Sequence, residues 1–568
     1  MKQINPRPWG FLDEYRGKVF NGEWPTIPEM WNITAGRYPD SHCFTIFAPY
    51  RMRLSYAEAS REIHRISAYL LNQGLKKGDR AALTGKNSPE WTLAYLGILF
   101  AGGVVVPIDY SIKTEETHGL IAVSGARFLF IDEEKRQDID PENHLKLEAI
   151  VGLASNMDNY ILSLPEAQDP PHEMPGENDL AAILFTSGTT GNSKGVCLSH
   201  RNFVSDCYLA QGNMDIFHSD VFYALLPLHH SYAMLAIFLE TISVGAELVF
   251  SQKVVVAQML KDFKEGRVSM FLSIPMLFNK IIKSLMKGIR AKGILVYGVI
   301  RFLMGISGFI KKVFKVNIGK KLFKGILSKV SLEYNRICIC GGGPLPSSTF
   351  KLFNQLGIDF VQGYGLTETS PILALNPPWR YKENSVGKIL PRVEVKIDDP
   401  DSSGNGEIVA RGPMVMQGYY KNEKQTAEVL SSDGWLKTGD AGHLDSENYL
   451  FITGRKKNLI VTAGGKNVFP EEIEDEFQLF DEISQILVKG YLVDAKSKEE
   501  HIGALIYPEP EWAKDKEPEE IRGALEKIIQ TVNQNMLPYK RIEKFKVLQE
   551  PLEVGGTLKI KRFMVGDF

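Results

Sequence analysis

The sequence predicts an α/β protein with more than one domain. Short runs of β-branched and aliphatic residues, at 80–83, 104–107 and 127–131, alternate with helical segments such as 91–103, a rhythm typical of helices packed on a mostly parallel sheet. Further runs of this kind occur at 180–185, 221–226, 247–250 and 336–340. The chain has 568 residues, several times the usual size of one cooperative core, so we expect at least two domains.

Composition and charge exclude several other classes of protein. Hydrophobic residues make up 44% and charged residues 24% of the chain, which argues against a disordered, fibrous or coiled-coil protein. With 66 basic and 68 acidic residues the net charge is −2, so nothing global indicates a nucleic-acid-binding protein. The five cysteines form no Cys-x-x-Cys pair with matching histidines, which argues against structural zinc and a disulfide framework.

The character of the sequence changes after residue 400. The stretch 398–406 is rich in turn residues, and strand-like runs follow at 407–411 and 449–453. The polar segment 454–458 comes next and is a candidate hinge. We therefore predict a large domain at 1–454, with a basic insertion at about 280–330, and a small domain at 455–568.

The region after the hinge is long enough for a small α/β domain. Strand-like runs lie near 486–489 and 501–507. A helix is expected at 518–535, because Pro518 suits the first turn of a helix.

The most informative stretch is a phosphate-binding loop candidate at 186–195. A strand-like run is followed there by ten residues that are almost all Gly, Ser or Thr, with Lys194 near the end. Glycines let the backbone approach an anion closely, hydroxyl and backbone N–H groups donate to phosphate oxygens, and the lysine adds positive charge. The loop is not a Walker A motif, because Ser193 is not followed by Gly-Lys-Ser or Gly-Lys-Thr. A surface loop of turn residues is the alternative interpretation.

The string Thr-Ser-Gly-Thr-Thr-Gly-x-Ser-Lys-Gly at 186–195 resembles the phosphate-binding signature of the adenylate-forming superfamily, which includes acyl-CoA synthetases, luciferases and peptide-synthetase adenylation domains. Other motifs of that superfamily follow in the same order. They are Tyr-Gly-x-Thr-Glu within 363–369, Thr-Gly-Asp at 438–440, the hinge arginine at 454–455, the segment beyond the hinge at 464–474, and the tail with the catalytic lysine at 557–562.

This resemblance implies a fold and a reaction. The fold is the adenylate-forming enzyme fold, a large multi-layer N-terminal AMP-binding α/β domain followed by a small mobile C-terminal α/β domain. The reaction joins a carboxylic acid to AMP, using ATP and Mg²⁺, and then transfers the acyl group to coenzyme A. Two anions must be neutralised and aligned in such a reaction, so position and charge supply most of the catalysis.

Roles for the middle motifs follow from the same resemblance. Glu368 would be the Mg²⁺ ligand, since Mg²⁺ prefers one or two carboxylates together with phosphate oxygens. Thr367 would donate to the α-phosphate, and Tyr364 would support the adenine ring. Asp440 would accept from the ribose hydroxyls, with Arg455 beside it. A solvated glutamate, a packed core tyrosine and a turn aspartate are the structural alternatives.

Further site residues are expected on both sides of these motifs. Gly342 and Gly343 resemble the Gly-Gly-Ala-Pro-Leu element that lines the adenine and acyl pockets, where absent side chains leave room for a ligand. His230 aligns with the Pro-x-x-His element near the acyl carboxylate, although either His229 or His230 could instead be a core residue. The nucleotide-binding loop residues are Thr186, Ser187, Gly188, Thr189, Thr190, Gly191 and Lys194.

Lys559 ranks first for the adenylation step, because its flexible ammonium could bridge the substrate carboxylate and the α-phosphate. The sequence departs from the family near it: Leu558 stands where many members have Gly, and Lys561 makes the register ambiguous. Lys457 is the aligned hinge residue. It would absorb the backbone change that exchanges the Lys559 face for the 464–465 face, which admits coenzyme A.

The long-chain fatty acyl-CoA synthetases are the most similar subfamily, on the strings at 363–371, 385–388 and 557–562. A separate observation agrees with an insoluble substrate. Between Gly266 and Leu332 there is no Asp or Glu, while fourteen basic residues alternate with apolar ones. We expect this basic amphipathic surface to lie on anionic lipid.

The run 293–310 is apolar except for Arg301, so a membrane span is marginal and lying on the bilayer is favoured over crossing it. A helical insertion with a solvated basic face and a buried apolar face is the alternative. The first ten residues lack the apolar stretch of a secretory signal. We therefore expect a cytoplasmic protein, peripheral at the inner face of the membrane.

Other functions stay open on the sequence alone. An acyl carrier protein could replace coenzyme A as the acceptor, with the basic stretch docking an acidic carrier. The chain could also be a membrane-bound lipid or nucleotide sensor without turnover, although Lys559, Glu368, Asp440 and Arg455 together argue against a mere binder. A luciferase-like oxygenase has no sequence feature in its favour. The motifs leave the length and type of the acyl chain undefined.

Overall fold

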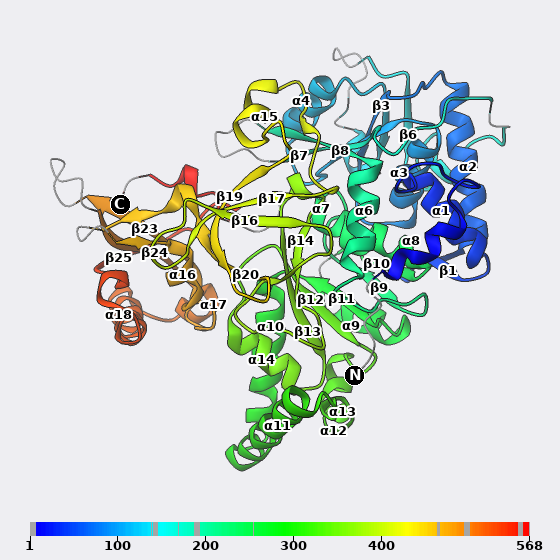
Figure 1. Ribbon diagram of the computed structural model, residues 1–568. Coiled ribbons are helices and arrows are strands. Elements are labelled where there is room, and N and C mark those ends of the chain that lie inside the picture. The colour runs from blue at the N-terminus through cyan, green and yellow to red at the C-terminus, as the bar shows by residue number, and fades with distance from the viewer. Residues whose placement is uncertain are drawn as a thin grey trace.

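The computed structural model describes residues 7–568 except 138, 140–145, 168–169, 187–192, 254, 463–465, 493–499, 555–559 and 567. Strands and helices alternate along most of the chain, and Figure 1 shows helices on the faces of central sheets, with the C-terminal residues gathered at one side. The α/β prediction is confirmed.

A seven-stranded sheet occupies the N-terminal part of the molecule. Its strand order is β18-β8-β7-β4-β3-β5-β6. The strands β7, β4, β3, β5 and β6 are parallel, whereas β8 and β18 are antiparallel additions. Their bounds are β3 Arg80–Thr84, β4 Val104–Ile108, β5 Phe128–Ile131, β6 Ala149–Gly152, β7 Leu180–Thr186, β8 Lys194–Ser199 and β18 Gly418–Tyr419.

A thirteen-stranded sheet joins a parallel half to an antiparallel half. The parallel half contains β1 His42–Ile46, β10 Glu247–Phe250, β9 Val221–Ala224, β11 Met270–Ser273, β12 Ile337–Cys340 and β13 Asp359–Gly365, with β2 Met52–Ser55 antiparallel at its edge. The antiparallel half contains β14 Ile372–Leu375, β15 Gly387–Ile389, β20 Tyr449–Arg455, β19 Leu436–Leu444, β17 Gly406–Arg411 and β16 Glu394–Asp398.

The helix α3 (Pro89–Phe100) lies in the core and is buried along its whole length, as expected for a helix that is hydrophobic all round. Ser88 caps it by accepting from the Trp91 N–H, so the helix begins two residues before the predicted start. Gly97 lets the neighbouring helix approach, because a Cβ there would lie 2.4 Å from Ile66 Cγ2.

Further helices of the large domain cover the two sheets. They are α1 Ile27–Arg37, α2 Tyr56–Asn72, α4 Thr114–Ser124, α6 His200–Ala210, the π-helical segment η3 Met234–Leu239, α8 Glu240–Val244, α9 Val256–Glu265, α14 Ser347–Gln355 and α15 Glu423–Val429.

The region after the predicted boundary has its own sheet and its own apolar cluster. The strands β23 (Ile483–Leu492), β24 (Glu500–Pro508) and β25 (Lys544–Val547) form the sheet, and α18 (Pro518–Gln534) packs with them around Ile502, Ile506 and Leu525. Both expected strands and the expected helix are present. We propose the boundary at 454/455, one residue before β20 ends at Arg455.

Beyond the contacts of the segment 454–458 itself, the two regions also touch through polar contacts. The Asn279 Nδ2 donates to Gln478 Oε1 at 3.1 Å, the Gln478 Nε2 donates to the Pro344 carbonyl at 3.3 Å, and Lys283 Nζ lies 3.1 Å from Asp481 Oδ1. Isolated polar contacts of this kind stabilise an interface only weakly. The arrangement is therefore compatible with the hinge motion that the sequence predicts.

The predicted basic insertion forms a helical subdomain between β11 and β12. Its helices are α10 Pro275–Arg290, α11 Ile294–Phe314, α12 Gly319–Leu322 and α13 Lys324–Leu327. In Figure 1, α11 lies at the lower edge of the molecule, away from the seven-stranded sheet. By length and composition α11 could cross a membrane. Only 17% of its apolar window is buried inside the protein, so it is not a core helix.

Candidate active site

The predicted site residues surround one cavity of about 1080 Å³. Of the eleven predicted residues that the structure describes, nine line it, and Gly343 and Asp440 lie outside its wall. The nine are Thr186, Lys194, His230, Gly342, Tyr364, Thr367, Glu368, Arg455 and Lys457. Ser187, Gly188, Thr189, Thr190, Gly191 and Lys559 lie outside the described residues.

The strand β13 positions the centre of the site, because it is where the large sheet changes direction. Its residues 359–362 pair in parallel with β12, and Gly363 and Tyr364 pair antiparallel with β14. Ligands of α/β sheets commonly bind at the carboxyl ends of parallel strands near such a change. The 3-10 turn η5 (Thr367–Thr369) follows β13 and places Thr367 and Glu368 against the cavity.

Tyr364, Asp440 and Arg455 form a three-residue polar cluster. The Tyr364 hydroxyl donates to Asp440 Oδ2 at 2.6 Å, and Arg455 Nε lies 2.7 Å from Asp440 Oδ1. Asp440 and Arg455 are direct register partners on β19 and β20. Burial, and then the Asp440 carboxylate, raise the pKa of the Tyr364 hydroxyl, which keeps it a hydrogen-bond donor at neutral pH.

A local feature of β19 aims the Asp440 carboxylate. Gly439 has a φ of +70°, a backbone conformation that a side chain would strain. The Asp440 N–H donates to Thr438 Oγ1 at 3.1 Å, and the Thr438 hydroxyl donates to the Ile408 carbonyl at 2.7 Å. All three residues of the Thr-Gly-Asp motif therefore shape one irregularity of β19, where its register with β17 shifts.

The loop candidate 187–192 is bracketed by two paired strand ends. Thr186 on β7 and Lys194 on β8 are register partners, and the Thr186 hydroxyl donates to the Lys194 carbonyl at 3.4 Å. Both line the cavity. The antiparallel pairing of β7 with β8 therefore sets both ends of the glycine-rich loop at the wall of the cavity.

Glu368 contacts a residue that sequence reasoning missed. The Tyr419 hydroxyl donates to Glu368 Oε1 at 2.9 Å, and Lys194 Nζ lies 4.9 Å from the centre of the Tyr419 ring. Tyr419 belongs to β18, which pairs with β8. The ring thus links the lysine of the loop motif to the glutamate of the Tyr-Gly-x-Thr-Glu motif. Because β18 is only two residues long, no local sequence pattern could have indicated it.

His230 sits in a second polar group. The His230 Nε2 lies 3.2 Å from His229 Nε2. The His229 Nε2 in turn lies 3.5 Å from Asp109 Oδ2. Burial, together with the neighbouring His229, lowers the pKa of His230 to about 3, so this imidazole is neutral at physiological pH. The ligand atoms of the three residues lie within 4.8 Å of one another. The direct contact of the two histidines orients His230 toward the cavity.

Ser231 is another residue that the sequence did not single out. Its hydroxyl shares a hydrogen bond of 3.1 Å with Thr367 Oγ1, so it connects the Pro-x-x-His element with the Tyr-Gly-x-Thr-Glu motif. The sequence feature that could have indicated Ser231 is its position directly after His230.

The glycines after β12 make room at the cavity. A Cβ on Gly341 would lie 2.9 Å from the Tyr232 ring, and Gly342 has a φ of +80°. The Tyr232 hydroxyl donates to the Ile339 carbonyl at 3.2 Å. The backbone at Gly341 therefore lies close to the Tyr232 ring with no side chain between them.

Much of the remaining cavity wall is apolar and comes from separate elements. We call this wall the apolar part, and it consists of Ala210, Met214, Phe222, Leu225, Ala236, Leu272 and Leu375. The nine predicted residues form the polar part. Glu240 also lines the cavity; its Oε1 accepts from Gln211 Nε2 at 2.8 Å, and burial raises the pKa of this carboxyl to about 8. A molecule with a charged head and an apolar tail matches this division.

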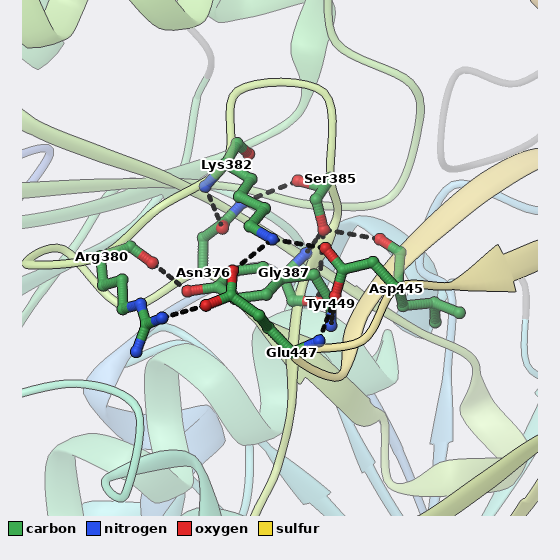
Figure 2. Close-up of polar contacts among 9 residues, drawn as sticks. Asn376, Arg380, Lys382, Ser385, Gly387, Asp445, Glu447 and Tyr449 are labelled. Carbon is green, nitrogen blue, oxygen red and sulfur yellow. Dashed lines mark hydrogen bonds and ion pairs between the residues drawn. The ribbon is translucent and has the colours of Figure 1, made fainter.

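A network outside the cavity fixes the strands that carry Asp440 and Arg455. Figure 2 shows Lys382 between Asp445 and Glu447, with Arg380 also paired to Glu447. Nearby, the Ser385 hydroxyl donates to the Leu450 carbonyl at 2.7 Å. These contacts join the β14–β15 connection to the β19–β20 turn.

Lys457 lies in the turn η6 (Lys456–Asn458) at the start of the small domain. Burial, and then the charge of Arg455, lower the pKa of Lys457. Its neighbour Lys456 pairs with Glu407 at 2.9 Å. The predicted hinge residue therefore lies both at the cavity and at the junction of the two regions.

Two family models match this chain. The AMP-binding enzyme model covers residues 31–420, and the AMP-binding enzyme C-terminal domain model covers residues 457–558. The long-chain-fatty-acid–CoA ligase ACSBG1 of Homo sapiens is 28% identical over 585 residues, which is 90% of this chain and 79% of the human protein.

Solved structures resemble the whole chain. The anthranilate CoA ligase AuaEII in complex with anthranoyl-AMP matches with a TM-score of 0.76 and 20% identity, covering 95% of this chain and 96% of that one. The o-succinylbenzoate coenzyme A synthetase MenE from Bacillus subtilis, in complex with ATP and magnesium ion, matches with a TM-score of 0.73 and 23% identity, covering 94% and 98%. The predicted two-domain adenylate-forming fold is thereby confirmed.

Proposed function

The chain belongs to the AMP-binding enzyme family, and from that premise we propose that it is an AMP-forming ligase that activates a long-chain fatty acid and passes it to coenzyme A. The acid and ATP would give acyl-AMP and pyrophosphate, and coenzyme A would then displace AMP. One observation carries the proposal above all. Nine residues from separate motifs line one cavity, and much of its remaining wall is apolar.

The polar part would hold the nucleotide. We assign the ribose to Asp440, whose two oxygens already accept from Tyr364 and Arg455. Accepting groups held in this way need little reorganisation when a ligand binds. The adenine would lie beside Tyr364 and the Gly342 backbone, and the phosphates would lie between the 187–192 loop and Lys194.

Adenylation requires a carboxylate oxygen to attack the α-phosphorus while pyrophosphate leaves. We assign to Lys559 the stabilisation of the negative charge that builds up between the carboxylate and the α-phosphate. Thr367 would donate a hydrogen bond to the α-phosphate. His230 would lie beside the acyl carboxylate. Because its pKa is about 3, it would act there as a neutral hydrogen-bonding group.

The residues present fit a magnesium ion at Glu368. Glu240, Glu407 and Glu428 also line the cavity. Glu407 pairs with Lys456, and the raised pKa of Glu240 keeps it protonated at neutral pH. Glu368 accepts from Tyr419 through Oε1 and lines the cavity next to Thr367. When bound, Mg²⁺ would supply charge neutralisation to the phosphate oxygens.

The choice of a long-chain acid rests on three observations. The apolar part of the cavity offers aliphatic and aromatic side chains to the acyl group. The human relative is named a long-chain-fatty-acid–CoA ligase. The basic insertion would also bring the enzyme to a membrane, where an insoluble acid would be found, so we propose a cytoplasmic enzyme that is peripheral at the inner face of the membrane.

An acyl carrier protein is the second candidate acceptor, because the fourteen basic residues of 266–332 would also suit an acidic carrier. Thioester formation with coenzyme A and with a carrier protein, measured on the same acyl-AMP, separates the two. We expect coenzyme A to support turnover.

The decisive experiment is pyrophosphate release from ATP across a panel of carboxylic acids, from short to long chain and aromatic, with and without coenzyme A. We expect release with long-chain acids and faster turnover when coenzyme A is present. Absence of release, and of pyrophosphate exchange into ATP, with every acid would reject the ligase and leave a non-catalytic lipid or nucleotide binder of the same fold.

A further inference from the structure

The helix α11 has two opposite faces with opposite environments. One face, at Tyr297, Ile300, Met304, Ser307 and Lys311, is directed to the protein, and its members are buried or partly buried. The spacing of three and four residues marks one side of a helix.

The other face of α11 is apolar and exposed. It consists of Leu295, Val299, Phe302, Ile306, Phe309 and Val313, which are 39% to 83% exposed, and we call it the α11 apolar face. These positions also follow one another by three or four residues. The alternative expected from the sequence, a buried apolar face with a solvated basic one, describes α10, where Phe278, Ile282 and Leu285 are buried and Lys287 is exposed, but it does not describe α11.

This exposure is concentrated at one place. Of the 25 large hydrophobic side chains that are exposed in the described part of the chain, ten fall within residues 294–316. Single exposed apolar residues are ordinary on soluble proteins, but a contiguous patch marks a surface that something else covers.

The α11 helix is fixed along the body of the protein. Lys311 Nζ lies 2.7 Å from Asp359 Oδ1 and donates to Asn354 Oδ1 at 2.7 Å, although the lysine is only 7% exposed. A Cβ on Gly308 would lie 2.8 Å from Gln355. A helix that crossed a bilayer would have to leave these partners, so the helix axis is set parallel to any surface that covers its outer face.

Charge identifies the covering surface as anionic. Residues 266–332 contain no carboxylate, and the basic side chains Arg290, Lys292, Lys312 and Lys315 stand exposed at the two ends of α11. The neighbouring Lys329 lowers the pKa of Lys292, which indicates a pair of like charges that an anion would relieve. Basic side chains flanking an apolar helix face are typical of interfacial helices on anionic lipid.

A second copy of the chain fits this surface poorly. Two copies facing each other through α11 would bring basic residues together without a compensating carboxylate from either insertion. An anionic bilayer offers both the apolar interior and the negative headgroups.

The neighbouring helix connects this surface to the cavity. Met276, Leu277 and Lys280 on α10 line the cavity wall, Met276 is 54% exposed, and α10 ends three residues before α11 begins. The part of the cavity wall formed by α10 therefore belongs to the same subdomain as the α11 apolar face.

We propose that the α11 apolar face docks on an anionic bilayer with the helix axis in the membrane plane, so that the insertion holds the cavity beside the lipid that supplies the acid. This assignment rests on the membrane association proposed above, but binding to lipid requires neither ATP nor turnover.

The first test is flotation of the full-length protein with phosphatidylcholine vesicles that contain 0 or about 30% phosphatidylserine. We expect binding that increases with anionic lipid and falls with salt. The double variant Phe302→Ser/Phe309→Ser should lose at least about tenfold in partitioning. A matched control, Leu492→Ser/Leu537→Ser, changes two side chains of similar exposure in the small domain and should float like the parent.

The second test measures orientation. The five native cysteines are buried, so an environment-sensitive label can be placed at Leu295→Cys, Phe302→Cys and Phe309→Cys in turn. The depth of each label is measured by quenching with lipids that carry quenchers at different depths. An in-plane helix puts all three labels at the same shallow depth. A graded series of depths would mean that α11 crosses the bilayer and would overturn the proposal.

Other results would also overturn it. Flotation that does not depend on lipid charge and is unchanged in the Phe302→Ser/Phe309→Ser variant would show that α11 is not the docking face. A concentration-dependent dimer that this double variant abolishes, without lipid binding, would assign the face to a second copy. Turnover of a short soluble acid, which needs no membrane, distinguishes failure of the docking proposal from failure of the ligase proposal. A protein that floats but does not activate acids refutes the ligase proposal alone.

Discussion

In the polar part of the cavity, side chains hold one another in place, whereas in the apolar part they only share a wall. Tyr364, Asp440 and Arg455 are joined by contacts of 2.6 and 2.7 Å, and Tyr419 joins Glu368 at 2.9 Å. Ala210, Phe222 and Ala236 come from three elements and line the cavity without polar contacts to one another. Changes in the polar part should therefore cost catalysis with any acid, and changes in the apolar part should alter which acid is used.

The largest effect is expected for Lys559→Ala, which removes the charge assigned to the transfer itself. Loss of one such contact typically costs about 10²- to 10³-fold in rate. Acyl-AMP formation, measured by pyrophosphate exchange, should fall by that amount, while conversion of supplied acyl-AMP with coenzyme A continues. Equal loss of both half-reactions would remove the assigned role. Lys561→Ala, which changes the alternative lysine of the tail, is the matched comparison.

The next effect tests the cluster around Asp440. Asp440→Asn keeps the shape but removes the charge that Arg455 and the Tyr364 hydroxyl both contact, so the KM for ATP should rise by about 10- to 100-fold with every acid. Glu394→Gln breaks an exposed pair with Arg411 on the neighbouring strands and should leave the KM unchanged, since such pairs contribute little. An acid-dependent effect of Asp440→Asn would contradict the division of the cavity.

A smaller and more selective effect is expected in the apolar part. Ala236→Phe fills space at the cavity wall, so kcat/KM should fall about tenfold for the longest acids and stay near the parent value for short ones. The KM for ATP should not change. Uniform loss across the acid panel would mean that Ala236 does not face the acyl chain.

The smallest effect concerns stability and pH. The pKa of Glu240 is raised to about 8 by burial, so the folded protein keeps a proton that the unfolded chain releases near its ordinary pKa of about 4.5. The stability gained from that proton is full below about pH 4.5, declines as the pH rises, and is lost above about pH 8.

Glu240→Gln removes this titration and keeps the volume of the side chain. The Tm of the variant should therefore exceed that of the parent by a margin that grows from pH 5 to pH 8, reaching a few degrees. Glu115→Gln, at an exposed position of α4, is the control. A constant difference in Tm across this pH range would show that Glu240 does not titrate as described.

Much of the polar part could be predicted from the sequence because each motif is local. Thr438, Gly439 and Asp440 are consecutive residues of β19, and Thr186 and Lys194 close one hairpin. Tyr419 and Ser231 escaped prediction because their partners lie 51 and 136 residues away. The apolar wall escaped it altogether, since an aliphatic residue that lines a cavity looks like any core residue.

The sequence by itself determined the α/β architecture, the separate C-terminal region and the identity of the polar residues, because these follow from periodicity and from short motifs whose chemistry is carried by neighbours in the chain. Only the tertiary structure decided that Tyr419 meets Glu368, which side chains line the apolar part, and that the apolar stripe of α11 faces outward. Periodicity gives a helix its two faces, but the partner that covers one of them, here Asn354 and Asp359 around Lys311, is chosen by packing between distant segments.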